Sequence, residues 1–252
     1  MNYITTIITA LIFLYFYNTY AKDSIILAVS ANAQYVIDEI IKAYKQKHTD
    51  VSIKKIVSSS GKLTNQITKG APFDIFLSAD MNYPIFLYKK GLTITEPKTY
   101  AYGLIVLWTT KNFSKKDLNI NIIYKVNKIA IPNPKTAPYG RESIKILKNL
   151  KVFKKIKNRI IYGESVSQVN YYILKGFVDI GFTSKSSVLA PVVENKGIWV
   201  EVDKNLYNPI KQGAVLLKNA KNKKQAYEFF RFLFSKKAKE IFKKYGYLVK
   251  DE

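Results

Sequence analysis

Apolar residues follow two alternating patterns along this chain of 252 residues. Short, nearly continuous apolar runs are typical of buried strands, whereas apolar residues spaced three and four apart are typical of amphipathic helices. The runs that predict strands are 25–29, 51–57, 74–77, 100–109, 128–131, 160–162, 178–183 and 212–218. The stretches that predict helices are 35–46, 63–69, 84–90, 141–150, 167–175 and 225–244. Because strands and helices alternate, we expect an α/β fold whose parallel sheets carry helices on both faces.

Two of these stretches are long for their class. Residues 100–109 combine strong strand propensity with enough length to cross between two lobes. Residues 225–244 predict a single closing amphipathic helix. Its apolar stripe consists of Tyr227, Phe230, Phe234, Ala238 and Ile241. Neither an internal repeat nor a low-complexity linker is present, so the pattern favours two lobes joined by crossing strands over two lobes on a flexible tether.

A short polar turn stands between a predicted strand and a predicted helix at three places. The turns are Ala31-Asn32, Ser58-Ser59-Ser60-Gly61 and Ala137-Pro138-Tyr139-Gly140. A helix that begins directly after such a turn has free backbone N–H groups, and its dipole adds a partial positive charge. The turns carry hydroxyl or amide side chains and no acid. Together they favour a pocket for a small, fully deprotonated anion.

The first 21 residues differ in character from the rest. Residues 4–17 form a continuous apolar run, and no charged side chain precedes Lys22. The run is shorter than the roughly 20 residues that span a bilayer comfortably. The small residues Thr19 and Ala21 occupy the −3 and −1 positions of a cleavage site. We therefore expect a secretory signal peptide over residues 1–21, with an uncleaved anchor as the alternative.

The chain contains no cysteine and a single histidine, His48. The lack of cysteine excludes disulfides, thiolate metal sites and thiol nucleophiles. It also excludes the lipid-modified cysteine that anchors many exported bacterial binding proteins, so we expect the exported chain to be soluble and not lipidated. A histidine cluster for a metal ion is impossible with one histidine.

The formal net charge is +23, from 41 Lys and Arg against 18 Asp and Glu. Such a charge suggests nucleic-acid binding, but only Arg141, Arg159 and Arg231 are arginines, and base and phosphate recognition favours arginine forks. The lysines are spread along the chain and fall mostly on the polar faces of predicted helices. We therefore expect a solvated, lysine-rich surface that attracts anions over long range, and no nucleic-acid partner.

Four segments stand in order along the chain. They are Ser59-Ser60-Gly61, then GAPFDIFLSAD at 70–80, then NPKTAPYG at 133–140, and last Glu164-Ser165-Val166 followed by DIGF at 179–182. In this order and spacing they resemble the periplasmic molybdate-binding proteins of ABC transporters. The resemblance extends from about residue 25 to residue 248, and four collinear motifs are far more specific than any one of them.

The resemblance implies a type II periplasmic binding protein with two lobes. Each lobe would be a mostly parallel sheet flanked by helices, with the ligand cleft between lobes. Lobe I would comprise residues 22–100 and 206–252, and lobe II residues 101–205. The family's function would be to capture molybdate or tungstate in the periplasm and deliver it to a membrane-embedded ABC permease. We would expect a monomer with neither enzymatic activity nor a cofactor.

The resemblance also implies a set of binding residues. Ala31 and Val166 would contribute backbone N–H groups. The family has two branches, one of which has serine in the first turn and tyrosine at the position of Ser184. This chain resembles the other branch, which leaves a role for Ser184 open. The residues carried over are Ala31, Asn32, Ser60, Tyr139 and Val166. Molybdenum or tungsten would be held only as the oxyanion, without a direct bond from protein to metal.

Each of these residues also has an ordinary structural role open to it. Asn32 and Ser60 could cap the helices that follow them. Tyr139 could be a partly buried ring in a turn shaped by its proline and glycine neighbours. Asp74 and Asp80 are expected to be structural acids, because a carboxylate facing a dianion would repel it.

The proposed set of groups selects among anions by chemistry. Phosphate carries a proton at neutral pH and is best recognised with one buried acceptor, whereas molybdate, tungstate and sulfate carry none. A shell made of donors alone therefore disfavours phosphate. The remaining anions differ in size, which the sequence does not define, so another deprotonated oxyanion such as sulfate is the alternative ligand.

An enzyme is the other class to consider. Serine hydrolysis needs a base, and the only histidine lies away from every serine-bearing turn. The Gly-x-Ser-x-Gly pattern of a nucleophile elbow is missing as well. A Ser–Lys dyad remains open by composition alone, but the sequence favours a binding protein.

Overall fold

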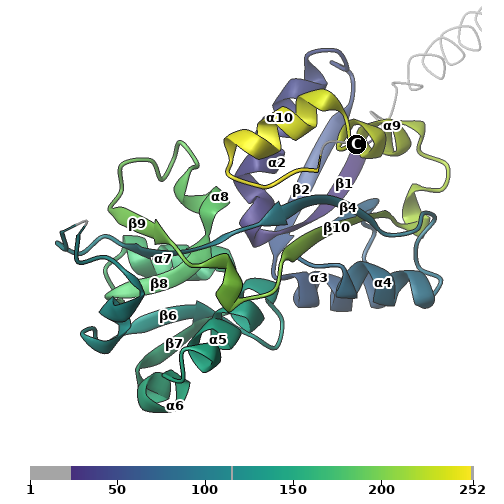
Figure 1. The fold of residues 1–252 in the computed structure, drawn as a ribbon. Coiled ribbons are helices and arrows are strands. Elements are labelled where there is room, and N and C mark those ends of the chain that lie inside the picture. Colours follow the sequence, from purple (N-terminus) through teal and green to yellow (C-terminus); the bar gives the residue numbers. More distant parts are fainter. Residues whose placement is uncertain (1–23, 115, 251–252) are drawn as a thin grey trace, which may run out of the picture.

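The computed structural model describes residues 24–114 and 116–250, which form two α/β lobes side by side (Figure 1). Each lobe is built on a five-stranded sheet. The first has the order β2-β1-β3-β10-β4 and contains β1 (Ser24–Ser30), β2 (Ser52–Ser58), β3 (Ile75–Ser78), β4 (Lys98–Gly103) and β10 (Ile210–Leu216). The second has the order β7-β6-β8-β5-β9 and contains β5 (Ile105–Thr109), β6 (Ile129–Pro132), β7 (Ile160–Gly163), β8 (Ile180–Ser184) and β9 (Ile198–Glu201).

One strand in each sheet runs against its neighbours. In the first sheet β1 is parallel to β2 and β3, and β10 is antiparallel to both β3 and β4. In the second sheet β6 is parallel to β7 and β8, and β5 is antiparallel to both β8 and β9. The other strands of each sheet therefore share a direction, and the predicted two-lobed, mostly parallel α/β fold is confirmed.

Helices cover both faces of both sheets. They are α2 (Gln34–Lys45), α3 (Ser60–Thr68), α4 (Asn82–Lys89), α5 (Pro138–Asn149), α6 (Phe153–Ile156), α7 (Val166–Leu174), α8 (Lys185–Val188), α9 (Lys224–Phe232) and α10 (Lys236–Lys244). Short 3₁₀ segments complete the chain: η1 (Ala31–Ala33), η2 (Ile120–Tyr124), η3 (Lys157–Arg159), η4 (Lys204–Leu206) and η5 (Lys218–Ala220). Within the described residues, every helix is too short or too polar to cross a bilayer.

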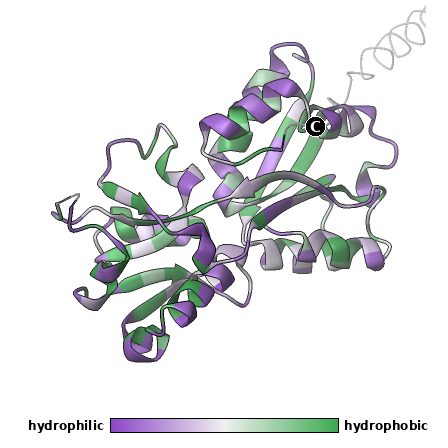
Figure 2. Ribbon diagram, viewed as in Figure 1, coloured by the Kyte–Doolittle hydropathy of each residue, from purple (hydrophilic) through white to green (hydrophobic). Residues whose placement is uncertain are grey.

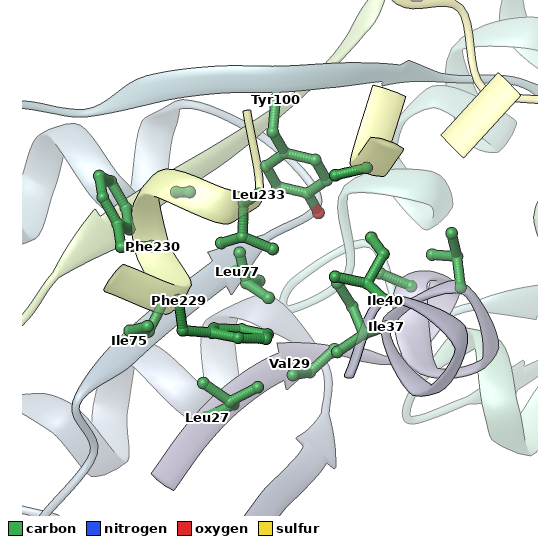
Figure 3. Close-up of a cluster of buried hydrophobic side chains, with 14 of the residues drawn as sticks. Leu27, Val29, Ile37, Ile40, Ile75, Leu77, Tyr100, Phe229, Phe230 and Leu233 are labelled. Carbon is green, nitrogen blue, oxygen red and sulfur yellow. The ribbon is translucent and has the colours of Figure 1, made fainter. Parts of the chain in front are cut away.

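The alternation of side chains along β1 explains the two-faced core of the first sheet. Leu27 and Val29 face a cluster that α2, α9 and α10 complete, and Figure 3 shows Ile37 and Phe229 closing over them. Ala28, between them, faces the opposite cluster under α3 and α4. Successive strand side chains point to opposite faces, so a strand buried on both sides needs apolar residues throughout. Figure 2 shows such apolar strands and helices that are polar outside.

The second sheet is built in the same way. Ile105 and Leu107 of β5 pack in a cluster with residues of α5 and α6, whereas Val106 and Trp108 pack in a cluster with residues of α7 and α8. The Trp108 indole N–H donates to the Lys196 carbonyl at 2.8 Å, which satisfies its one polar group inside the core. The two layers of helices therefore fix the ends of the central strands, where the predicted turns lie.

The chain passes between the sheets at two places. The predicted strand 100–109 is in fact two strands: β4 ends at Gly103, and β5 begins at Ile105 in the other sheet. Leu104 alone separates them. The return runs from β9 to β10 through residues 202–209. Lobe limits at residues 100/101 and 205/206 stay predictions, since each lies within or beside these crossings.

The structure corrects two other predictions. The expected single helix 225–244 is two helices, α9 and α10, because the Ser235 hydroxyl accepts the Ala238 N–H and starts a new helix. A serine in extended conformation followed by such a bond is an N-cap. Strand β9 was not expected at all, because its four residues follow a Lys-Gly turn and present no long apolar run. Gly91, expected to end the helix 84–90, follows α4 with a φ of 65°, as a C-terminal glycine should.

Candidate oxyanion-binding site

The turns singled out in the sequence meet between the two lobes. Segment η1 follows β1, α3 follows β2, and α5 and α7 follow β6 and β7. The Gly61 N–H donates to the Thr136 carbonyl at 2.9 Å, which joins the turn of α3 to that of α5. The Asn133 N–H donates to the Gly163 carbonyl at 2.7 Å, which joins the turns of α5 and α7. The carboxyl ends of strands from both sheets thus converge on one region, as is common for ligand sites in α/β folds.

All five predicted residues lie in this region and are buried. Ala31, Tyr139 and Val166 belong to one buried cluster, which also contains Ala79. Ser60 reaches the same cluster through its hydroxyl, which accepts the Ala79 N–H at 3.0 Å. None of the five is more than 4% exposed. The structure therefore brings the five together from both lobes, and their contact with an anion stays a prediction.

The helix N-termini in this region supply backbone donors. Ser60 is the first residue of α3, Tyr139 the second of α5 and Val166 the first of α7. Their N–H groups have no hydrogen-bond partner among the described residues. Such orphan donors are expected in the first turn of any helix, but they are normally solvated or capped rather than buried. Three of them from both lobes form a ready site for a negative charge.

Unpartnered hydroxyls accompany these N–H groups. The side-chain oxygens of Ser59, Thr136, Tyr139 and Ser167 are buried and have no hydrogen-bond partner among the described residues. Each belongs to, or directly adjoins, one of the three helix starts. A buried hydroxyl without a partner is costly, by about 1–3 kcal/mol. Their clustering at the same helix starts indicates a place for a ligand that accepts hydrogen bonds.

Ser60 is held in place by its own lobe. Its hydroxyl is 2.6 Å from that of Ser30 at the end of β1, and it also accepts the Ala79 N–H. Ser59, not Ser60, is the N-cap residue of α3, and it makes no side-chain capping bond. The alternative role of Ser60 as a helix cap is therefore wrong. Ser30 was not predicted, because it falls between the expected strand 25–29 and the turn Ala31-Asn32.

Asn32 stabilises the first turn through hydrogen bonds to other parts of the protein. Its side-chain amide donates to Gln212 Oε1 at 2.7 Å and to the Tyr247 hydroxyl at 2.9 Å, so both of its donors are used within the protein. Its carbonyl accepts from Tyr247 at 3.1 Å and from Ser186 at 2.7 Å. The side chain does not cap α2, whose N-cap is Ala33. The side-chain donors of Asn32 are therefore engaged within the protein, and its contact with an anion stays a prediction.

The residues that hold Asn32 were not predicted. Gln212 also donates through Nε2 to the carbonyls of Ala79 and Ile210, at 3.1 and 2.9 Å. It is fully buried in β10, between Lys211 and a run of small and apolar residues, and a polar residue inside a predicted strand was the available signal. Tyr247 lies 215 residues from Asn32 in the chain, so no local pattern could pair them. Burial raises the pKa of the Tyr247 phenol.

Tyr139 lies at the crossing between the lobes. Its hydroxyl packs so closely on Gly103 that a side chain at Gly103 would overlap it, with a Cβ only 2.0 Å from the oxygen. Burial raises the pKa of the Tyr139 phenol well above its usual range, and Asn32 lies near enough to oppose the rise slightly. The phenol is therefore a neutral donor at physiological pH. The close approach of the Tyr139 hydroxyl therefore explains why β4 ends in a glycine.

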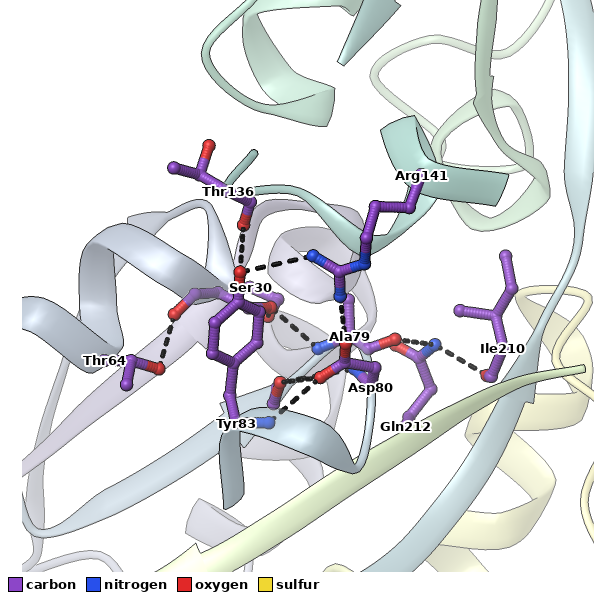
Figure 4. Close-up of polar contacts among 11 residues, drawn as sticks. Ser30, Thr64, Ala79, Asp80, Tyr83, Thr136, Arg141, Ile210 and Gln212 are labelled. Atoms are coloured by element: carbon purple, nitrogen blue, oxygen red, sulfur yellow. Dashed lines mark hydrogen bonds and ion pairs between the residues drawn. The ribbon is translucent and has the colours of Figure 1, made fainter. Parts of the chain in front are cut away.

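Charged contacts bridge the lobes at the edge of the site. Figure 4 shows Arg141 of α5 extending towards Asp80 and Tyr83 of the first lobe. Burial raises the pKa of the Asp80 carboxyl, and the Arg141 guanidinium opposes that rise. A second ion pair joins Lys62 of α3 to Glu164, just before α7. These contacts hold the lobes together, and they keep the Asp80 carboxylate engaged with a cation.

The remaining predicted residues have structural roles. Asp74 is fully buried, accepts the Ile26 N–H at 2.8 Å and pairs with Lys223 at 2.9 Å. The Ser184 hydroxyl accepts the Ser187 N–H and caps α8. No group of three or more His, Cys, Asp or Glu side chains able to hold a metal ion occurs within 24–114 and 116–250. The site thus offers donors from both lobes, which suits an oxyanion.

The chain is similar to known extracellular binding proteins. Residues 25–248 match the family described as bacterial extracellular solute-binding protein. The molybdate-binding protein ModA of Rhodobacter capsulatus is 34% identical over 230 residues, which cover 91% of this chain and 90% of that one. The solved periplasmic molybdate-binding protein of Azotobacter vinelandii superposes with a TM-score of 0.83 at 27% identity, covering 90% of this chain and all of that one.

A more distant structure has the same fold. The sulfate-binding protein SubI of Mycobacterium tuberculosis superposes with a TM-score of 0.74 at 13% identity, covering 90% of this chain and 87% of that one. This likeness concerns the fold alone. The Rhodobacter and Azotobacter proteins are named as molybdate-binding proteins rather than as enzymes. With the family match over nearly its whole described length, this chain belongs to the bacterial extracellular solute-binding proteins.

Proposed function

We propose that this protein binds molybdate or tungstate between its lobes and delivers the anion to an ABC import permease. The observation that carries the proposal is the buried set of unpartnered donors at the starts of α3, α5 and α7. Donors from both lobes can close on one tetrahedral anion, and two relatives with this fold are named as molybdate-binding proteins. The protein would bind the anion without changing it chemically.

Each predicted residue has a specific part in this proposal. Ser60 would donate its hydroxyl proton to the anion, with the Ala79 N–H keeping the oxygen in place. Tyr139 and Val166 would donate backbone N–H groups from the second lobe. Ala31 and Asn32 would donate backbone N–H groups from the turn that Gln212 and Tyr247 support. The oxyanion would accept every hydrogen bond, so no protein atom would bind the metal directly.

The carboxylates described beside these turns, Asp80 and Glu164, are both paired with cations, which favours a fully deprotonated anion. Phosphate at neutral pH carries a proton that needs an acceptor. The nearest carboxylate in the network, Asp80, is engaged by Arg141 and by the Tyr83 N–H. Molybdate and tungstate are nearly the same size, so we expect the site to separate them poorly. Sulfate is the runner-up ligand because it too accepts without donating.

A transport role in the periplasm requires that the protein itself be exported across the inner membrane. The apolar run 4–17 and the expected cleavage after Ala21 lie outside the described residues. We propose that residues 1–21 are a signal peptide and that a soluble, unlipidated monomer begins at Lys22 in the periplasm. Amino-terminal sequencing of the exported protein tests this directly. Sequence that still begins at Met1 would refute the cleavage.

A thermal-shift panel of oxyanions tests the ligand. An anion that binds only the folded state adds about 2.7 kcal/mol at 100 times its dissociation constant. We therefore expect molybdate and tungstate to raise the melting temperature by several degrees, while phosphate and nitrate leave it unchanged. A larger shift with sulfate than with molybdate would mean that sulfate, the alternative ligand, is the anion that the site prefers. No shift with any of these anions would refute the site.

A further inference from the structure

A basic groove crosses the surface of the first lobe and reaches the crossing between lobes. It consists of two cavities of about 590 and 460 Å³ that share Tyr102, Val249 and Lys250. Apolar and aromatic side chains contribute to its lining, among them Phe234 in the first cavity and Leu248 in the second. None of the five predicted anion-binding residues lines it. The groove is therefore a second feature, separate from the site between the lobes.

The cations of the basic groove share one property. Within residues 24–114 and 116–250, none of them forms an ion pair with a carboxylate, and no acidic residue of those ranges lines either cavity. They are Lys98, Lys204, Lys211, Arg231, Lys239 and Lys250. Three other surface cavities contain carboxylates, such as Glu39, Glu194 and Glu142. The segregation is therefore more than the average effect of a lysine-rich surface.

The apolar part of the basic groove is held rigidly at the surface. Leu248 is 47% exposed. It is fixed to β4 by two backbone hydrogen bonds with Tyr102, of 2.8 and 2.9 Å. Lys250 Nζ stands 5.8 Å from the Tyr102 ring centroid, and Lys98 Nζ stands 5.9 Å from that of Phe234. Ammonium groups thus lie beside two half-buried rings, and one exposed leucine is held next to them by backbone hydrogen bonds.

We propose that the basic groove binds the surface of a membrane rich in anionic phospholipids. A lysine is a flexible point charge that attracts lipid phosphates without the fork geometry of arginine. Each lysine near an anionic leaflet contributes to binding, and an exposed leucine or aromatic ring can enter the boundary between headgroups and acyl chains. In the basic groove the cations would meet the lipid phosphates, and the exposed Leu248 would enter that boundary. Binding would hold the protein near the membrane that it serves.

Vesicle cosedimentation of the purified protein tests the proposal. The probes are phosphatidylcholine vesicles with and without phosphatidylglycerol, at low and at physiological salt. We expect binding only to the vesicles that contain phosphatidylglycerol, and weaker binding as salt rises. The triple variant Lys98→Glu, Lys239→Glu, Lys250→Glu should lose about tenfold or more of that affinity.

A matched control separates the groove from total charge. Lys154→Glu, Lys155→Glu, Lys157→Glu makes the same charge change on α6 and η3 of the second lobe, and should stay within about threefold of wild type. Circular dichroism checks that both variants fold. If the triple variant does not fold, the single variant Lys250→Glu provides the same comparison, because it replaces one exposed residue near the C-terminus. Equal losses in groove and control variants would overturn the proposal. So would wild-type protein that ignores phosphatidylglycerol, or a groove variant that binds as wild type does.

Discussion

The Ser60 hydroxyl is the side chain in the candidate site whose removal gives the clearest outcome. It would donate to the anion while accepting the Ala79 N–H. Ser60→Ala removes a donor to a buried charged ligand, which should cost about 1.5–3 kcal/mol of binding, or roughly ten- to a hundredfold in affinity. Titration calorimetry with molybdate measures the loss.

Ser235→Ala is a matched control for that substitution. It removes a serine hydroxyl that caps α10, away from the site, where the Ala238 N–H donates to it at 3.2 Å. We expect it to lower the free energy of unfolding by about 1 kcal/mol and to leave the affinity for molybdate unchanged. If Ser60→Ala lowers stability but not affinity, Ser60 is structural and the residue set needs revision.

Sequence could indicate the members of the site that have a local signature. Ser60, Tyr139 and Val166 stand at helix starts after strands, and the motifs around them are contiguous. Gln212 and Tyr247 could not be found in the same way, because they reach Asn32 only through the tertiary fold, across 180 and 215 residues. The side chain of Asn32 looked like a free donor in the sequence, and only the structure reveals its two partners.

The elements that could be predicted from sequence are those with long or unambiguous apolar patterns. Strands β1 and β2 and helix α2 agree with the expected spans to within a residue or two at each end. The failures have local causes. The strand 100–109 breaks at Leu104, because its two halves join different sheets. Helix 225–244 breaks because a capping serine interrupts a continuous apolar stripe.

Helix α5 contributes the arginine that links the lobes. The Asp80 pKa is raised by burial, and Arg141 opposes the rise. We therefore expect Arg141→Gln to raise the Asp80 pKa further, as carbon-detected NMR titration of that carboxyl would measure. The ion pair is partly exposed, with Arg141 at 34% and Asp80 at 14%, so we expect the variant to weaken molybdate binding only about two- to fivefold.

Arg159→Gln makes the same charge change without touching the lobe interface. Arg159 donates to the carbonyls of Tyr124 and Val126 inside the second lobe, at 3.2 and 2.6 Å. It should leave both the Asp80 pKa and the affinity unchanged.

Because the folded Asp80 holds its proton more tightly than the unfolded chain, its contribution to stability is present at acid pH and is lost as pH rises through the folded pKa. An Asp80 pKa that falls in Arg141→Gln would contradict the interlobe ion pair.

The whole molecule should bind its anion almost independently of pH near neutrality. The candidate shell contains no histidine, and burial raises the pKa of Tyr139 and of Tyr247 above the usual value of about 10. These phenols stay protonated, and their raised pKa values lower stability only in strongly alkaline solution. Affinity should change less than about threefold between roughly pH 6 and 8.5. A tenfold change across that range would mean that a titrating side chain belongs to the site.

Titration calorimetry with a set of anions shows whether the two lobes bind a deprotonated oxyanion through donors alone. Molybdate and tungstate should bind with one site per protein, and phosphate should not bind. The measured heat of molybdate binding should not depend on the ionisation enthalpy of the buffer, since no proton moves when a deprotonated anion meets neutral donors. Binding of phosphate in preference to molybdate, or clear proton uptake with molybdate, would mean that the site is not a donor-only site for a deprotonated anion.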